Sequence, residues 1–220
     1  MSTCEVFELP ELELEPYELR EALRCVLHTV LFQRALGLAR PRDVPSELFE
    51  GVSYATVGDA AGEELVEERI AKCCKAFEQT VAKLARGGGA AGASSAATFA
   101  VEMGFYERRT KQVWFSKSEE RVYWEKWRLK LSVVRPGLQG ELVDGAARAR
   151  RHAAAEAGVL RCMERVLELA DARKDHLPPV VSSEVVCFPF DITTPSATDS
   201  SFGMDMLKKF VSQSPPSMLQ

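Results

Sequence analysis

The sequence predicts an α+β fold in which three main helices pack on one face of a mainly antiparallel sheet. Apolar residues recur at the three- and four-residue spacing of helices in three stretches, and they alternate with polar residues in several shorter ones. The predicted order is strand, helix, strand, helix, hairpin, helix, strand. With 220 residues, of which 46% are apolar and 27% charged, the chain can bury a core, and we expect a single domain over residues 1–220.

The first predicted strand surrounds Pro10, where apolar residues alternate with glutamates. A proline cannot donate to a strand ladder, so we expect an edge strand that is interrupted at this position. Apolar residues at helical spacing from Leu19 then predict a helix that ends near Gly37. After a loop with two prolines, a β-rich run predicts a strand within residues 48–57.

Four glutamates open the second predicted helix, which extends over residues 63–84. They are Glu63, Glu64, Glu67 and Glu68. They complement the positive end of the helix dipole, and we expect a solvated helix start rather than a catalytic pair of carboxylates. The run GGGAAGASSAA, residues 87–97, then predicts a flexible connector. It lacks the Gly-Lys-Ser/Thr sequence with which a phosphate-binding loop holds its nucleotide.

The second half of the chain predicts a hairpin, a third helix and a short strand. Alternating apolar residues place the hairpin strands at 98–107 and 122–134, with a polar loop between them. The third helix is expected at 146–172 and the short strand at 185–190. From about residue 191 the chain is rich in Ser, Thr and Pro, and we expect this segment to be partly ordered by docking.

Charge and targeting features argue against several classes of protein. The net charge of −4 argues against a surface built wholly for nucleic acid. The first nineteen residues hold six glutamates and no Lys or Arg, unlike a secretory or mitochondrial signal. Six scattered cysteines without a CxxC motif are typical of reduced cytosolic thiols, and no apolar run is long enough to span a membrane. We therefore expect a cytoplasmic protein without stable membrane insertion.

The sequence contains little that indicates a catalytic or metal-binding site. His28, His152 and His176 lie on or beside predicted helices, without a GxSxG nucleophile motif. His28 has no partner four residues away, so we expect it to serve in packing. Cys73 and Cys74 are adjacent on a helix and diverge in direction, which favours packing over metal binding. We therefore expect no enzyme, no metal, no cofactor and no small-molecule substrate.

All three tryptophans fall in one short stretch of an otherwise aromatic-poor chain. Trp127 is assigned to the core of the hairpin. The position of Trp124 is left open, because residues three apart in a strand face opposite sides. Trp114 and Phe115 lie on the polar loop, where two large rings either bind a partner or fold back against their own domain.

Eight lysines and arginines interleave with these aromatic residues over 105–130. Those nearest Trp114 and Phe115 are Arg108, Arg109, Lys111 and Lys117. If the two rings bind a partner protein, these cations form a polar rim or steer an acidic partner. The alternative is single-strand nucleic-acid binding over 105–130, in which bases stack on the rings beside a basic groove.

Five separated blocks of the chain resemble the autophagy-related protein 101 family, particularly its plant-type members. They are residues 23–32 (LRCVLHTVLF), 104–115 (GFYERRTKQVWF), 124–134 (WEKWRLKLSVV), 176–179 (HLPP) and 201–207 (SFGMDML). The resemblance implies a HORMA fold and a non-enzymatic subunit of the autophagy-initiating protein kinase complex. It also implies pairing with the HORMA domain of autophagy-related protein 13, which the subunit stabilises.

The resemblance gives Trp114 and Phe115 a role as well. Family members carry an exposed Trp-Phe pair, the WF finger, which recruits downstream autophagy factors to the forming phagophore. Trp114 and Phe115 match this pair, although many animal members place a proline between the two rings and this chain does not. By analogy with HORMA dimers, the third helix is expected to contribute to pairing. On this interpretation the partners are proteins, and no nucleic acid is expected.

Overall fold

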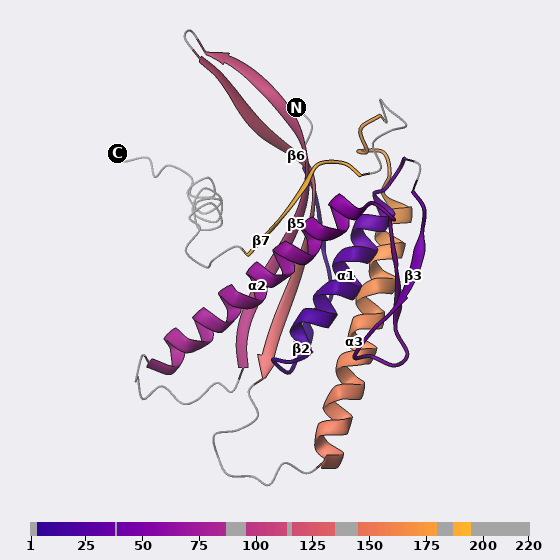
Figure 1. Cartoon of the computed structure of the whole chain (residues 1–220), viewed down its shortest axis with the longest axis vertical. Coiled ribbons are helices and arrows are strands. Elements are labelled where there is room, and N and C mark those ends of the chain that lie inside the picture. The colour runs from indigo at the N-terminus through magenta and orange to yellow at the C-terminus, as the bar shows by residue number, and fades with distance from the viewer. Residues whose placement is uncertain are drawn as a thin grey trace, which may run out of the picture.

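The computed structural model describes residues 4–37, 39–86, 96–113, 116–134, 145–179 and 187–194. Within these ranges it contains three helices and seven strands (Figure 1). The helices are α1 (Leu19–Gln33), α2 (Ala60–Arg86) and α3 (Gly145–Ala172). The strands are β1 (Glu5–Glu8), β2 (Leu12–Leu14), β3 (Arg42–Pro45), β4 (Ser53–Thr56), β5 (Ala96–Val113), β6 (Ser116–Val134) and β7 (Phe190–Thr193). The predicted α+β class is confirmed, and the arrangement is consistent with a HORMA-like fold.

The main sheet is built on the long hairpin of β5 and β6. Neighbouring strands follow the order β1-β6-β5-β7, and β2 pairs with β6 further along. β5 is antiparallel to both β6 and β7, whereas β1 and β2 run parallel to β6. The sheet is therefore mainly antiparallel, as predicted. Because β1 and β2 flank Pro10 and pair with the same strand, the predicted edge strand interrupted at this proline is also confirmed.

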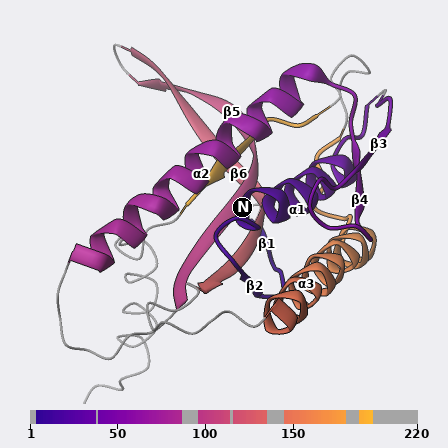
Figure 2. The same ribbon diagram turned by 60° about the horizontal axis from the view of Figure 1, so that its bottom comes forward.

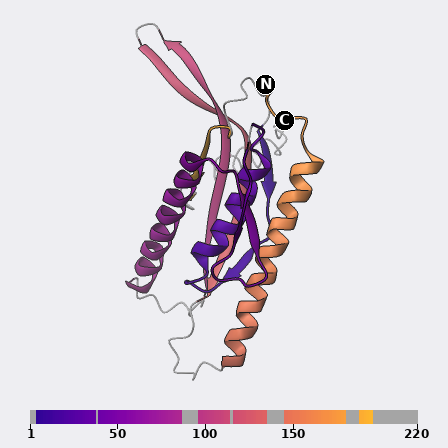
Figure 3. The same cartoon turned by 45° about the vertical axis from the view of Figure 1, so that its right-hand side comes forward.

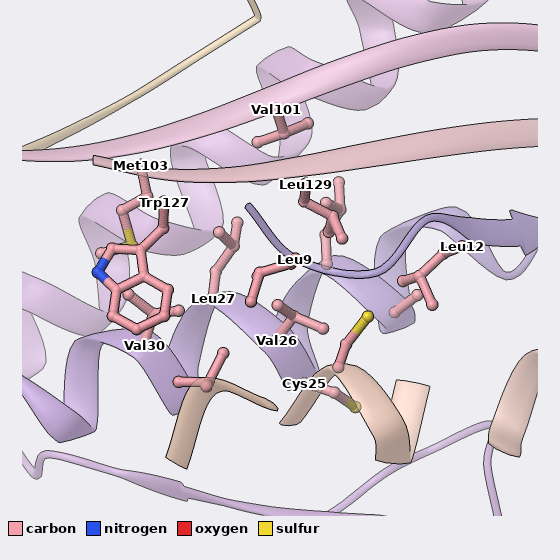
Figure 4. Close-up of a cluster of buried hydrophobic side chains, with 14 of the residues drawn as sticks. Leu9, Leu12, Cys25, Val26, Leu27, Val30, Val101, Met103, Trp127 and Leu129 are labelled. Carbon is pink, nitrogen blue, oxygen red and sulfur yellow. The ribbon is translucent and has the colours of Figure 1, made fainter. Parts of the chain in front are cut away.

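All three helices pack on one face of this sheet, and α1 lies between α2 and α3 (Figure 3). Apolar side chains of α1, such as Val26 and Val30, meet Trp127 and Leu129 of β6 in the buried cluster of Figure 4. Burial of such apolar surface is the main favourable contribution to folding. In the described part of the chain, no helix is long and apolar enough to cross a membrane.

A second, two-stranded sheet of β3 and β4 lies beside α1 (Figure 2). β3 falls within the predicted loop with two prolines, so that prediction is wrong for residues 42–45. Prolines are tolerated there because β3 is an edge strand. β4 is shorter than the predicted run. Phe49 and Val52 are buried without belonging to a strand, so their apolar character reflects core packing.

The β5–β6 hairpin is longer than predicted. Of residues 108–121, expected as a loop, 108–113 continue β5 and 116–121 belong to β6, which begins at Ser116. The prediction fails because this part of the hairpin has no buried face in the sequence pattern. Polar residues on both faces give no apolar alternation that would indicate a strand.

Two other predicted boundaries shift. β5 begins at Ala96, within the predicted connector 87–97, whose residues 87–95 lie outside the described ones. The last strand occupies Phe190–Thr193 rather than 185–190, so the first residues of the expected C-terminal segment belong to the sheet. Residues 195–220 of that segment lie outside the described part.

Candidate interaction hairpin and the clusters that fix it

The outer part of the β5–β6 hairpin, residues 106–113 and 116–123, extends beyond its neighbouring strands. We call it the stem. β7 pairs with β5 only as far as Phe105, and beyond it the strand pairing described for β5 is with β6. Figures 1 and 3 show the stem projecting past the helices. A projecting element of this kind is accessible to another molecule.

The end of the stem carries the two residues that the sequence singled out. Val113 pairs with Ser116, so the chain that joins these strand ends consists of Trp114 and Phe115. Both residues lie outside the described part of the chain. The segment between the two strand ends is therefore two residues long, whereas the sequence predicted a long loop.

The four predicted rim residues belong to the strands of the stem. Arg108, Arg109 and Lys111 lie in β5, and Lys117 lies in β6. Arg108 and Arg109 are exposed. Because successive residues of a strand point to opposite faces, these two arginines cannot act on one face. The side chains of Lys111 and Lys117 lie outside the described ones.

A β-bulge in β6 separates the stem from the body of the sheet. Phe105 pairs with Glu125 while Tyr106 pairs with Tyr123, which leaves Trp124 without a partner in β5. The extra residue shifts the alternation and turns Trp124 toward the helices. The bulge also places Tyr123 on the outer face of the sheet, together with its partner Tyr106.

Both tryptophans of β6 belong to the core. Trp124 is 5% exposed and Trp127 is 2% exposed. The ring of Trp124 packs against Phe105, Phe188 and His176, at centroid distances of 5.6, 5.1 and 5.9 Å. The assignment of Trp127 to the core is therefore confirmed, and the open position of Trp124 is resolved in the same way. Because both rings are buried, neither can stack on a base. The nucleic-acid alternative requires such stacking, so these two tryptophans do not support it.

A fully buried carboxylate, Glu125, lies next to the bulge. The Nε atom of Arg34 lies 2.9 Å from each of its oxygens, and Trp127 Nε1 and His176 Nε2 each lie 2.5 Å from one oxygen. Arg34 follows α1 and His176 follows α3, so Glu125 ties both helix ends to β6. The guanidinium supplies the positive charge that a buried carboxylate requires.

Sequence reasoning missed this cluster, although one signal was present. Glu125 is an acid at an inward position of a run whose other inward residues are apolar, among them Trp127, Leu129 and Leu131. A charged residue at a core position requires a buried partner of opposite charge. The sequence alone does not name Arg34 as that partner, because it lies 91 residues away.

Glu67 on α2 is held by two residues of α1. Arg24 donates from Nε and Nη2 at 2.8 and 2.9 Å, and His28 Nε2 lies 3.7 Å from the carboxylate. His28 and Arg24 hold the pKa of Glu67 at about 2, below its ordinary value of 4.5, although burial opposes this shift. The expectation of a solvated helix start is therefore wrong for Glu67, because this side of α2 lies against α1.

Glu18, just before α1, links that helix to α3. Its side chain is 1% exposed, accepts a hydrogen bond from the backbone N–H of Glu15 at 2.8 Å and lies 2.6 Å from His152 Nδ1. Arg151 Nε donates to Glu15 Oε1 at 3.0 Å. The first turns of α3 are thereby fixed to the segment that enters α1.

Each histidine thus lies beside a glutamate that joins two elements of the fold. The pairs are His28–Glu67, His152–Glu18 and His176–Glu125. This arrangement supports the packing role predicted for His28. Within the described ranges, no group of three or more His, Cys, Asp or Glu side chains is arranged to hold a metal ion. Burial raises the pKa of the Cys25 and Cys162 thiols to about 12, which keeps them protonated and poorly nucleophilic.

α3 presents one long side to solvent. Its buried residues are Ala155, Gly158, Val159, Cys162, Val166, Leu169 and Ala170. Exposed residues on other sides of the helix include Arg150, Ala154, Ala157, Arg161 and Arg165. The same side also carries Glu164 and Glu168, and Glu168 pairs with Arg165, so its charge is mixed. Such a surface is accessible to a second protein.

Comparison with known proteins places these features in a family context. Residues 11–184 match the family model of Autophagy-related protein 101. The chain is also 37% identical over 229 aligned residues to Autophagy-related protein 101 from Arabidopsis thaliana, with 98% of this chain and 99% of the relative covered. The stem, Glu67 and Glu125 all fall within the residues that match the family model.

Proposed function

Since the chain belongs to the autophagy-related protein 101 family, we propose that it is a non-enzymatic adaptor of the autophagy-initiating protein kinase complex. In this role it pairs with the HORMA domain of autophagy-related protein 13 and stabilises it. Through Trp114 and Phe115 it recruits downstream autophagy factors to the phagophore assembly site. The complex thereby supports autophagosome formation.

The observation that carries the finger proposal is the geometry of the stem. Two paired strands end at Val113 and Ser116, with Trp114 and Phe115 between them. Aromatic side chains are frequent anchors at protein interfaces, and paired strands that fix both ends of the segment joining them lower the entropy lost on binding. The base of the stem is fixed by the buried ring of Trp124.

The pairing proposal draws on the exposed side of α3. Near its start, His152 contacts Glu18, and near its end the backbone carbonyl of Ala170 accepts from Arg34 Nη1 at 3.5 Å. A helix held at both ends offers a preformed surface, which reduces the ordering needed on association. We place the contact with autophagy-related protein 13 on the side that contains Arg150 and Arg161.

The finger is tested with the double variant Trp114→Ala/Phe115→Ala. We expect it to lose capture of downstream autophagy proteins while it keeps the wild-type Tm and its binding to the HORMA domain of autophagy-related protein 13. Val6→Ala is the control, because it trims an apolar side chain that is 36% exposed on β1. A large fall in Tm would show instead that the two rings pack within their own domain.

The pairing surface is tested with Arg150→Glu/Arg161→Glu. We expect this variant to weaken co-purification with the HORMA domain of autophagy-related protein 13 by about tenfold, because it reverses two charges on one surface. Lys130→Glu reverses an exposed charge on β6, on the far face of the sheet, and is expected to leave pairing intact. Wild-type pairing of the α3 variant would exclude this side of the helix.

A further inference from the structure

The two faces of the stem differ in charge. Strand register places one set of residues on the outer face of the sheet, which we call the arginine face: Tyr106, Arg108, Thr110, Glu119, Arg121 and Tyr123. The opposite face carries Glu107, Arg109, Glu120 and Val122. Sequence reasoning treated the cations of this region as one rim, whereas the register divides them between two surfaces.

On the opposite face, the cation has acidic neighbours. Arg109 Nη2 lies 3.3 Å from Glu107 Oε2, and Glu120 is the residue directly across the hairpin from Arg109. Opposite charges in cross-strand positions stabilise a hairpin. The charge of Arg109 is therefore compensated by acidic residues of the stem itself.

On the arginine face, Arg108 lies directly across from Arg121. Like charges in these positions destabilise a strand pair. The positive charge of Arg121 is compensated, since its Nη1 lies 2.9 Å from Asp191 Oδ2 and its guanidinium lies 5.0 Å from the centre of the Tyr106 ring. Arg108 is exposed, and among the described residues no carboxylate lies within 4.0 Å of its guanidinium. One cation on this face is thus left for an external anion.

We propose that the arginine face is the side of the stem on which the finger's partner docks, and that this partner presents carboxylates to Arg108. The partner is a protein with an acidic segment beside the apolar residues that contact Trp114 and Phe115, so the inference rests on the proposed function of the finger. Arginine binds carboxylates through paired hydrogen bonds, and charges at the rim of an interface fix orientation and raise the association rate. Arg109 faces away and takes no part.

The test uses a short fluorescein-labelled oligoglutamate peptide and the full chain at low ionic strength. We expect Arg108→Glu to weaken binding by about fivefold, and the matched reversal Arg109→Glu to change it by less than about twofold. Arg108→Glu is expected to fold, because it replaces a like-charge pair with Arg121 by an opposite-charge pair. Arg108→Gln provides a second variant that removes the charge without reversing it, and it should also weaken binding.

The same peptide separates this inference from the proposed finger function. It has no apolar residues, so Trp114→Ala/Phe115→Ala should bind it as the wild type does. Retained recruitment by Trp114→Ala/Phe115→Ala would overturn the finger proposal alone, whereas peptide binding that does not depend on Arg108 would overturn the arginine face alone. Equal losses for Arg108→Glu and Arg109→Glu would overturn the arginine face. It would also be overturned if phosphatidylserine vesicles bound the chain through Arg108 while the peptide did not bind.

Discussion

Arg34 and Glu125 form an ion pair that is almost wholly excluded from solvent, with the guanidinium Nε 2.9 Å from both carboxylate oxygens. The pair connects the end of α1 to β6. It lies beside Trp124, at the base of the stem. Burial strips both charges of water, so their attraction largely replaces lost hydration. If one partner is removed, the other is left as an uncompensated charge in the core.

We therefore expect Glu125→Gln to lower the free energy of unfolding by about 3–5 kcal/mol, because Arg34 stays charged without a buried partner. Urea unfolding followed by tryptophan fluorescence measures this change. The control is Glu168→Gln, which removes an exposed carboxylate 2.8 Å from Arg165 and should cost less than about 1 kcal/mol. Similar values for the two variants would contradict the strong coupling of the buried pair.

The double variant Arg34→Met/Glu125→Met makes a second, independent check on the same pair. It removes both charges, so it should be more stable than Arg34→Met alone. It should not fully regain wild-type stability, because Trp127 Nε1 loses its acceptor. If the double variant is less stable than either single variant, packing rather than charge dominates at this position.

Gly104 in β5 leaves room for the ring of Tyr123 in β6. A Cβ atom at Gly104 would lie 2.8 Å from both Cδ1 and Cε1 of that ring, closer than carbon atoms can approach. The ring is also held by Lys126, whose Nζ lies 4.9 Å from its centre. We expect Gly104→Ala to lower the free energy of unfolding by about 1–3 kcal/mol, measured by urea unfolding.

Gly145→Ala is the matched control for this substitution. It adds the same methyl group at the start of α3, where no other segment of the described chain comes within 4 Å of the new Cβ, and should change stability by less than about 0.5 kcal/mol. Adding Tyr123→Ser to Gly104→Ala should relieve part of the loss. A loss no larger than that of the control would show that the ring moves freely.

The helices and the inner strands could be predicted because each buries one side of a regular element. In α3, Val159, Val166 and Ala170 repeat at the helical period and face the core. In β5, Val101 and Met103 lie on either side of the polar Glu102 and are almost fully buried. At these positions the local pattern and the tertiary contacts favour the same structure.

The stem and its base could not be predicted in the same way. Beyond Tyr106 the described side chains of the stem, at 107–110 and 119–123, are exposed or only partly buried, so the sequence there shows no apolar alternation. At the base, Trp124 is one extra residue in β6, and a single insertion reverses the faces of all residues that precede it. The partner of Glu125 is set by the packing of α1 on the sheet, which no local pattern encodes.

Cys25 and Cys162 should resist alkylation in the folded protein. Burial raises the pKa of both thiols to about 12, and the thiolate is the reactive form. With iodoacetamide at pH 8, we expect Cys4, which is partly exposed, to be modified first, while Cys25 and Cys162 stay unmodified. Mass spectrometry of the peptides gives the order. In denaturant all six cysteines should react at similar rates, and rapid native labelling of Cys25 would contradict its burial.

Glu67 makes the contact between α1 and α2 dependent on pH. Its pKa is held at about 2 in the folded protein, by His28 and Arg24, against 4.5 for the free side chain. A carboxylate whose folded pKa is depressed adds stability that is fully present above its unfolded pKa. That stability is lost as the pH falls from about 4.5 toward 2. Because the side chain is 31% exposed, solvent screening reduces the contribution to about 1–2 kcal/mol.

We therefore expect Glu67→Gln to be less stable than the wild type by about 1–2 kcal/mol at pH 7, and this difference to narrow steadily below pH 4.5. Urea unfolding of both proteins at a series of pH values measures the difference. Glu68→Gln is the matched control, since Glu68 is the next residue of α2 and pairs with Lys72 on the exposed side of the helix. It should show little change at any pH. A difference for Glu67→Gln that stays constant down to pH 3 would show that the side chain acts by packing, because the loss of a charge contact must follow the titration of the carboxylate.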